Sequence, residues 1–514
     1  MVWYGVGKAD VKLSDLQSWR LFITIKNNQI HFPTTKNQHT KMAQQVAIIA
    51  APTMGNLIPA VEFATHLINH HHHHHHRRIS VAILLISMPQ WPLNHHYIQS
   101  HTSTEHIRFI HLHPLHPPNQ CDSIVDLISL HIENHKHIVE ETLKTLPSLA
   151  GVFVDMFCTS VIDVAADLDI PCYLFFASPA TYLGFVLHLA TLPAAESLDS
   201  AADLTVPSFA NSVPVTVLPS YCIKRTELGY SKFVRHALRY KETKGIVVNT
   251  FKELEPYALD SLSSDKYPGL PPVYPVGPII DHVGPAKWHS NRSSHEKIME
   301  WLDRQPSRSV VFLCFGSMGS LGRAQVREIA TGLERAGFRF LWALREPGKE
   351  KLELPKDYEE VGESLFPAGF IDRTAKMGLV SGWAPQVSVL AHEAIGGFVS
   401  HCGWNSILES IWYGVPIATW PLYAEQQLNA FEMVNELGLS VELRLDSRDG
   451  GGDLVLAEEL ERGVRELMMD GGDGELIRKK VKEMSEKAKK ALMENGSSFQ
   501  AMDDLINDVL LSND

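Results

Sequence analysis

Several features that assign a chain to a class of protein are missing from this sequence of 514 residues. No run approaches the roughly 18 apolar residues that a membrane-spanning helix needs. The first residues, MVWYGVGKADVKLSDLQSW, are interrupted by charges where a signal peptide has its apolar stretch. We therefore expect neither an integral membrane segment nor secretion.

Positive charge and paired cysteines are also scarce. The 46 Lys and Arg residues face 59 Asp and Glu residues, and the net charge of −13 argues against nucleic acid as a partner. The six cysteines show no paired spacing, and several lie in apolar runs where thiols usually stay reduced. This pattern favours a cytoplasmic protein. No G-x-G-x-x-G motif follows a strand, which disfavours nicotinamide cofactors.

From Met42 onward the sequence alternates short apolar strands with amphipathic helices, which is typical of parallel sheets wrapped by helices. The chain is too long for one core, so two such domains are expected. The predicted strands are Val46–Ala50, Ser80–Ile86, Ile107–Leu112, Gly151–Val154, Cys172–Phe176 and Gly245–Asn249, then Ser309–Phe315, Arg339–Ala343, Gly378–Ser381, Gly397–Ser400, Pro416–Thr419 and Ser440–Leu443. The predicted helices include Asn56–Asn69, Ser123–Leu146, Ser160–Leu168, Arg323–Ala336, Glu425–Leu437, Ala457–Met468, Gly474–Leu492 and Ser498–Leu511.

The same pattern predicts the domain boundaries. Residues 1–41 lack periodicity and are expected to be a disordered extension, or an upstream reading ahead of a start at Met42. A first domain is assigned to 42–280 and a second to 297–490, with a linker at 281–296. The proline- and glycine-rich stretch Pro268–Pro285 breaks the periodicity and is interpreted as the interdomain linker. Residues 491–514 are expected to form a C-terminal helix that packs back on the first domain.

The most informative segment runs from Trp383 to Gln426. Within it a buried strand turns at residues 401–406 into a helix that runs to about Gly414. Such a turn directs free N–H groups and a positive dipole end outward, so a diphosphate is the natural ligand. Glu409, one helical turn further on, suits vicinal ribose hydroxyls, and Trp383 offers an aromatic face to a uracil ring. Alternatively these tryptophans are core residues and the glycines ordinary turns, which explains a single residue better than the whole ordered set.

This segment resembles the signature box of plant UDP-dependent glycosyltransferases. The residues that match are Trp383, Pro385, Gln386, His401, Gly403, Trp404, Asn405, Ser406, Glu409, Pro416, Glu425 and Gln426. The resemblance covers about residues 44–512 and is greatest to the branch that acts on phenolics, flavonoids and hormones. It implies an α/β fold of two doubly wound Rossmann-like domains facing a cleft, known as GT-B.

The resemblance also implies inverting transfer of glucose from UDP-glucose to an acceptor oxygen, without a metal and by a monomer. Helix ends stabilise the departing UDP. The implied UDP-sugar ligands are Ser317, His401, Asn405 and Ser406 for the diphosphate, Trp383, Gln386 and Glu409 for the nucleoside, Trp404, Glu425 and Gln426 for the sugar, and Ala384 beside them. Ser317 follows a buried strand in the glycine turn Phe315–Ser320, which alternatively is a plain turn. The first domain is expected to bind a small aromatic acceptor.

One position departs from the family pattern. The first strand-to-helix turn, Pro52–Pro59, should carry a histidine that acts as general base, oriented by an aspartate. The aspartate is present as Asp155, but the base position holds Asn56, and an amide cannot take a proton at neutral pH. Alternatively Asn56 is an ordinary helix N-cap.

Three functional interpretations of Asn56 stay open. The acceptor is acidic enough to need no strong base, Asp155 serves directly or through water, or catalysis is impaired. The last would make the protein a non-catalytic UDP-sugar-binding or partner protein. A related alternative is an enzyme that glucosylates a carboxylate and forms an ester.

Histidine-rich segments raise the question of a metal. The run His70–His76 lies between a predicted helix and strand and is interpreted as a solvated loop. His131 and His135 have the i,i+4 spacing of two zinc ligands but lack a third ligand. The tripeptide Asp167–Asp169 resembles a metal-binding DxD motif but falls at a helix end in the wrong domain. We expect no metal.

Overall fold

The computed structural model describes most of the chain from Gln44 to Leu511. The described ranges are 44–74, 79–88, 91–118, 121, 123–192, 203–223, 228–284, 292–348, 355–358, 365–446 and 454–511. The predicted extension at residues 1–41 lies outside them. No helix in these ranges is both long and apolar enough to cross a bilayer.

The first domain is built on a parallel sheet of seven strands within the described residues, in the order β3-β2-β1-β4-β5-β6-β7. The strands are β1 (Gln44–Ala50), β2 (Ile79–Leu85), β3 (Ile107–His111), β4 (Leu149–Asp155), β5 (Cys172–Phe176), β6 (Ile246–Val248) and β7 (Val273–Pro275). The central strands are buried along most of their length, because helices cover both faces of the sheet. All six predicted strands of this domain are confirmed to within two residues.

Strand β7 corrects the interpretation of Pro268–Pro285 as linker. It pairs with β6 at the edge of the first sheet. An edge strand tolerates proline, because the N–H groups on its outer side pair with nothing in the sheet. The proline-rich segment therefore contains an edge strand of the first sheet as well as a connection toward the second domain. After it, the chain is described again from Arg292, where helix α11 begins inside the range 281–296.

The helices of the first domain differ from prediction at two places. They are α2 (Met54–His74), α3 (Pro92–Ser100), α4 (Ile124–Asn134), α5 (Lys136–Lys144), α6 (Val161–Asp167), α7 (Ala180–Leu189), α8 (Ser220–Ile223), α9 (Leu228–Tyr240) and α10 (Pro256–Leu262), with a 3₁₀ turn at Val215–Val217. The predicted helix Ser123–Leu146 is two helices that meet at His135. The expected loop at His70–His76 is wrong up to His74, because α2 continues to that residue.

The second domain repeats the arrangement. Its parallel sheet has six strands in the described residues, ordered β12-β9-β8-β13-β14-β15. These are β8 (Val310–Cys314), β9 (Arg339–Ala343), β12 (Gly378–Ser381), β13 (Ile395–Ser400), β14 (Ile417–Thr419) and β15 (Ser440–Glu442), beside the short antiparallel pair β10 (Arg345–Glu346) and β11 (Lys356–Asp357). The six predicted strands are confirmed.

The helices of this half are α11 (Arg292–Leu302), α12 (Arg323–Ala336), α13 (Phe370–Thr374), α14 (Gln386–Leu390), α15 (Trp404–Tyr413), α16 (Gln426–Phe431), α17 (Ala457–Met468), α18 (Gly472–Ala491) and α19 (Ser497–Leu511). Helix α16 continues as a π-helical segment, Glu432–Glu436. The predicted boundaries of α12 and α17 are confirmed to the residue.

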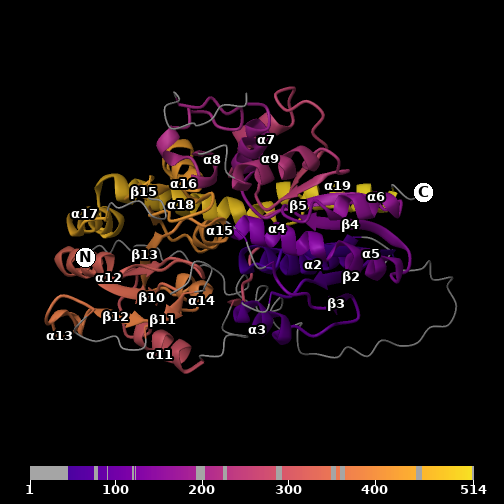
Figure 1. Cartoon of the computed structure of the whole chain (residues 1–514). Coiled ribbons are helices and arrows are strands. Elements are labelled where there is room, and N and C mark those ends of the chain that lie inside the picture. The colour runs from indigo at the N-terminus through magenta and orange to yellow at the C-terminus, as the bar shows by residue number, and fades with distance from the viewer. Residues whose placement is uncertain are drawn as a thin grey trace, which may run out of the picture. The chain divides into compact units, whose positions relative to one another are not determined.

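Helix α19 belongs to the first domain although it ends the chain. Leu505, Ile506 and Val509 are buried in the same apolar cluster as Val46 and Phe63. In Figure 1 the yellow helix lies among the indigo and magenta elements of the first sheet, and it contacts α2 and β7. Each sheet has apolar clusters on both faces, which confirms the doubly wound α/β fold.

Candidate functional site

The turn between β13 and α15 leaves the first N–H groups of a helix open. Cys402 adopts a left-handed conformation with φ of 61°, and Gly403 precedes the helix without a side-chain cap. The amide of Asn429 fixes the turn by donating to the Cys402 carbonyl at 2.9 Å. The helix then closes at Gly414 in a left-handed conformation. An anion is the ligand that such an uncapped helix start attracts.

His401 joins this turn to the predicted turn at Ser317. Burial lowers the pKa of His401 to about 4, so its imidazole is neutral at neutral pH. Its Nε2 atom lies against two glycines, since a Cβ added to Gly316 or Gly403 would sit 2.5 or 2.6 Å from it. Gly316 also has φ of 75°, a conformation that favours glycine. Ser317 is half-buried and directly follows Gly316, the glycine that lies against the His401 ring.

Three of the residues predicted to bind the nucleoside or diphosphate contact one another. The amide nitrogen of Gln386 donates to Ser406 Oγ and to Glu409 Oε2, both at 2.7 Å. Burial raises the pKa of Glu409 to about 7. Trp383 and Ala384 lie just before Gln386, and the backbone N–H of Trp383 donates to Asp357 at 3.1 Å. The side chains of Gln386, Ser406 and Glu409 thus place an amide, a hydroxyl and a carboxyl group side by side.

The predicted sugar ligands lie at the start of α16. Glu425 is half-buried, and burial raises its pKa. The Gln426 oxygen accepts from the N–H groups of Leu422 at 2.9 Å and Tyr423 at 3.1 Å, which turns the amide nitrogen the other way. Glu425 and Gln426 therefore offer an acceptor and a donor next to each other.

The side chain of Trp404, another predicted sugar ligand, bonds to the first domain. Its side chain is 3% exposed, and the indole N–H donates to the Asn249 carbonyl of the first domain at 2.7 Å. The indole N–H of Trp404 is therefore engaged by the first domain. The backbone N–H of Trp404 remains at the open start of α15, because this residue begins the helix.

In the first domain Asn56 and Asp155 form the expected pair. Asn56 Nδ2 donates to Asp155 Oδ2 at 2.8 Å, and the Asn56 oxygen accepts from the Thr53 hydroxyl at 2.5 Å. Asp155 ends β4, and burial raises its pKa to about 6 against the opposing effect of hydrogen bonds from Phe157 and Asn56. The N-cap interpretation of Asn56 is wrong, because α2 begins at Met54 and Asn56 is its third residue.

The two turns meet. The Asn405 amide, at the start of α15, donates to the Gly55 carbonyl beside Asn56 at 3.0 Å. This hydrogen bond joins residues separated by 350 positions in the chain and connects the turn before α15 with the turn that carries Asn56. Sequence reasoning missed Thr53 although it lies in the turn that carries Asn56, because a single threonine in a turn has no distinctive spacing.

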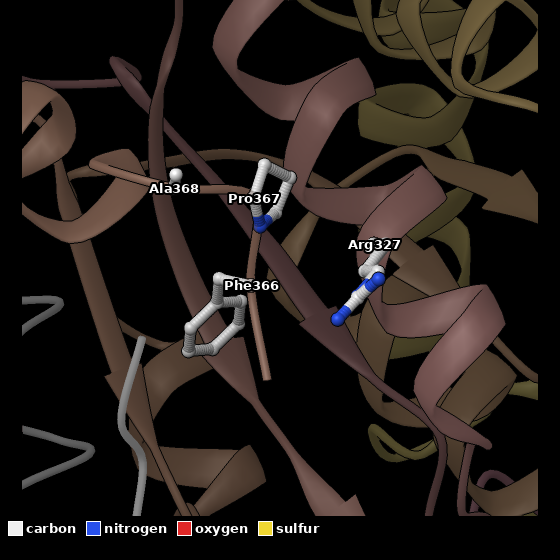
Figure 2. A pocket seen from close by; sticks show the side chains of 4 residues that line it. All are labelled: Arg327, Phe366, Pro367 and Ala368. Carbon is white, nitrogen blue, oxygen red and sulfur yellow. The ribbon is translucent and has the colours of Figure 1, made fainter. Parts of the chain in front are cut away.

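Other candidate features stay apart from this site. His131 and His135 are buried and bond to the carbonyls of Ser87 at 2.9 Å and His131 at 2.8 Å, and no group of potential metal ligands occurs in the described ranges. The Asp167–Asp169 tripeptide follows the end of α6. Figure 2 shows a surface depression lined by Arg327, Phe366, Pro367 and Ala368, which includes none of the predicted site residues.

Comparison with known proteins decides the family. The family described as UDP-glucuronosyl and UDP-glucosyl transferase matches residues 241–450. UDP-glycosyltransferase 43 of Pueraria montana var. lobata is 53% identical over 90% of this chain and 99% of its own length. The chain belongs to the UDP-glycosyltransferase family.

Further relatives agree with this assignment. The UDP-glucose flavonoid 3-O-glucosyltransferase 6 of Fragaria ananassa is 44% identical over 92% of this glycosyltransferase and all of its own length. The crystal structure of UGT71G1 from Medicago truncatula complexed with UDP-glucose has a TM-score of 0.82 and 41% identity, and covers 91% of this chain and 98% of that one. The GT-B fold expected from the sequence is thereby confirmed.

Proposed function

We propose that this glycosyltransferase moves glucose from UDP-glucose to an acidic oxygen, typically a phenolic hydroxyl, of a small plant metabolite. The observation that carries the proposal is the contact between Asn405 and Gly55. It joins an open helix start suited to a diphosphate with the turn that carries Asn56, the residue bonded to Asp155 at the end of β4. The names of the relatives, which include flavonoid and anthocyanidin glucosyltransferases, support the same reaction.

Each part of the site has a proposed role. The diphosphate lies at the start of α15 with His401, Asn405, Ser406 and Ser317 around it, and the positive dipole end of this helix stabilises the negative charge that develops on departing UDP. The remaining donor contacts are Trp383, Ala384, Gln386 and Glu409 for the nucleoside, and Glu425, Gln426 and the Trp404 backbone for glucose.

The two domains divide the work in this proposal. Residues 42–280 bind the acceptor and residues 297–490 bind the UDP-sugar, while the last helix anchors to the first domain. The protein acts as a monomer in the cytoplasm and uses no metal, because an open helix start supplies the positive end that a metal ion would otherwise provide.

Mass spectrometry of a panel of phenols incubated with UDP-glucose tests the reaction directly. A glucosylated product is expected from acidic phenols, together with released UDP. Binding of UDP without a product from any acceptor would refute the proposed activity and leave a UDP-sugar-binding protein.

Variants test the donor site. Base stacking on an aromatic ring contributes about 1–3 kcal/mol, so Trp383→Ala should raise the KM for UDP-glucose roughly tenfold. His401→Ala should weaken donor use by a similar factor through loss of a group beside the diphosphate. Trp301→Ala is the matched control, because Trp301 is a half-buried tryptophan of α11 in the same domain. An unchanged donor KM in both site variants would contradict the assignment.

A further inference from the structure

The hydrogen bonds of Asn56 fix which way its amide faces. A carboxylate only accepts hydrogen bonds, so the nitrogen of Asn56 is the atom that lies 2.8 Å from Asp155 Oδ2. The oxygen then faces Thr53, whose hydroxyl donates to it. An amide nitrogen carries two N–H groups, and the bond to Asp155 uses one. The second is a hydrogen-bond donor on a half-buried residue at the meeting point of the two turns.

Asp155 is poorly placed to contact an acceptor. Its side chain is 1% exposed, and both carboxylate oxygens have partners. Oδ1 accepts from the Phe157 N–H at 3.0 Å, and Oδ2 accepts from Asn56. Because Asp155 is buried, an acceptor hydroxyl would have to displace the groups that cover this side chain to reach its carboxylate. Of the open interpretations of this site, direct deprotonation by Asp155 therefore has the least support.

We propose that the acceptor reacts as an oxyanion that has lost its proton before transfer, and that Asn56 holds this oxyanion through its second amide N–H. This inference rests on the proposed function. The oxyanion attacks the anomeric carbon of glucose, a new carbon–oxygen bond forms with inversion, and the bond from that carbon to the diphosphate breaks. The electron pair leaves with UDP, and no proton passes to the protein. The acceptors are therefore acidic phenols or carboxylic acids.

The surroundings of Asn56 suit a bound anion. The first turn of α2 contains no acidic residue, and its helix start contributes a positive dipole end. Asp155 is the charged group that contacts Asn56, and its charge is offset by two N–H donors. The charge of Asp155 also acts on Cys158 and Tyr240. Burial raises the pKa of both side chains well above the usual values, so both stay uncharged.

The pH dependence of the wild-type enzyme separates a pre-formed oxyanion from a protein base. We would measure kcat/KM against pH for a series of phenols whose own pKa values extend from strongly acidic to about 10. For a pre-formed oxyanion, each profile rises until the pKa of that phenol, so the inflection moves with the acceptor. A protein base would give one inflection common to all acceptors, which would overturn the inference.

Two variants extend the test. Asn56→Ala removes the donor and should lower kcat/KM for acidic phenols about tenfold or more, while UDP binding measured by calorimetry stays unchanged. Asn56→His supplies a base and should raise turnover of weakly acidic phenols by about a hundredfold, with a new inflection shared by all acceptors. No loss in Asn56→Ala, with the protein folded and UDP bound, would refute the role of Asn56.

The result for carboxylic acids identifies which oxyanion the site takes. A glucose ester is cleaved by mild alkali, whereas a phenyl glucoside survives it, so the product of each acceptor class can be assigned. Either product with an inflection that follows the acceptor supports the inference. If transfer occurs but the inflection is fixed, the proposed function stands and the inference fails. If no acceptor is glucosylated at any pH, both fail.

Discussion

A buried pair of carboxyl groups where the two domains meet leads to a prediction about stability. Glu255 directly precedes α10 of the first domain, and Glu432 lies in the π-helical segment that continues α16. The side chains hydrogen-bond each other and are 2% and 1% exposed. Two carboxyl groups can share such a bond only if one of them carries a proton.

The contacts of the pair show where the proton resides. Both oxygens of Glu255 accept backbone N–H groups at the start of α7, from Ala180 at 3.0 Å and from Thr181 at 2.8 Å. Glu432 accepts only the Thr181 hydroxyl among these groups, at 2.6 Å. Glu255 is therefore the ionised partner and Glu432 the protonated one. Burial raises the pKa of both, and that of Glu432 well above its ordinary value.

The variants Glu255→Gln and Glu432→Gln should differ in stability. Glu432→Gln keeps an oxygen for Thr181 and an N–H for Glu255, so we expect little loss of stability near pH 5. Glu255→Gln turns an amide N–H toward a backbone N–H at the start of α7. An unsatisfied buried donor costs about 1–3 kcal/mol, so the free energy of unfolding should fall by that amount.

The pH dependence of Glu432→Gln has a definite sign. In the unfolded chain a glutamate ionises near pH 4.5, while folded Glu432 keeps its proton to higher pH. Above pH 4.5, and as long as folded Glu432 keeps its proton, the folded wild type binds more protons than the unfolded chain. Its free energy of unfolding therefore falls as pH rises, by about 1.4 kcal/mol per pH unit for one proton. Glu432→Gln lacks this loss. The difference in free energy of unfolding between the variant and the wild type should therefore grow with that slope until the pH reaches the pKa of folded Glu432.

Urea unfolding of both proteins at intervals of about one unit between roughly pH 5.5 and 8.5 measures the difference. Asp155, Glu409 and Glu425 also have raised pKa values, but they are present in both proteins and cancel in the comparison. Parallel stability curves would refute a proton held by Glu432. Equal losses in Glu255→Gln and Glu432→Gln would refute the assignment of charge within the pair.

Three further predictions follow from single features. Trp404→Phe leaves the buried Asn249 carbonyl without its 2.7 Å donor and should cost about 1–3 kcal/mol of stability, so an unchanged melting temperature would count against this bond. Deleting residues 1–41 should leave folding and activity nearly intact, because the first core strand begins at Gln44, and an insoluble product would contradict this. Activity should survive exhaustive chelation, and its loss to EDTA with recovery on added Mg²⁺ or Mn²⁺ would show that a metal takes part.

Elements with a periodic or a wholly apolar pattern could be predicted from sequence. Helices α12 and α17 match prediction to the residue because their apolar positions lie on one face, and β5 does so because it is a short apolar run. Helix α7 was absent from the predicted helices. Nine of its ten residues are buried, so it shows no alternation between an apolar and a polar face.

Some features of the candidate site could likewise be predicted from sequence, and others could not. The donor turn and the pair Asn56 and Asp155 could be predicted, since each depends on residue types at a fixed place in a short motif. The engagement of the Trp404 indole by Asn249 and the pairing of Glu255 with Glu432 could not. Both join segments from different domains, and no local pattern records which distant group a side chain will meet.

The place of α19 has a consequence for synthesis of the chain. Leu505, Ile506 and Val509 complete the apolar cluster on one face of the first sheet, which is built from the earliest strands. As the ribosome releases the chain from its N-terminal end, those strands emerge long before the helix that covers them. Helix α2 covers part of this face early, but the part that packs against α19 stays exposed in the nascent first domain while the second domain is translated. Chaperone binding to ribosome-attached chains should persist until α19 emerges.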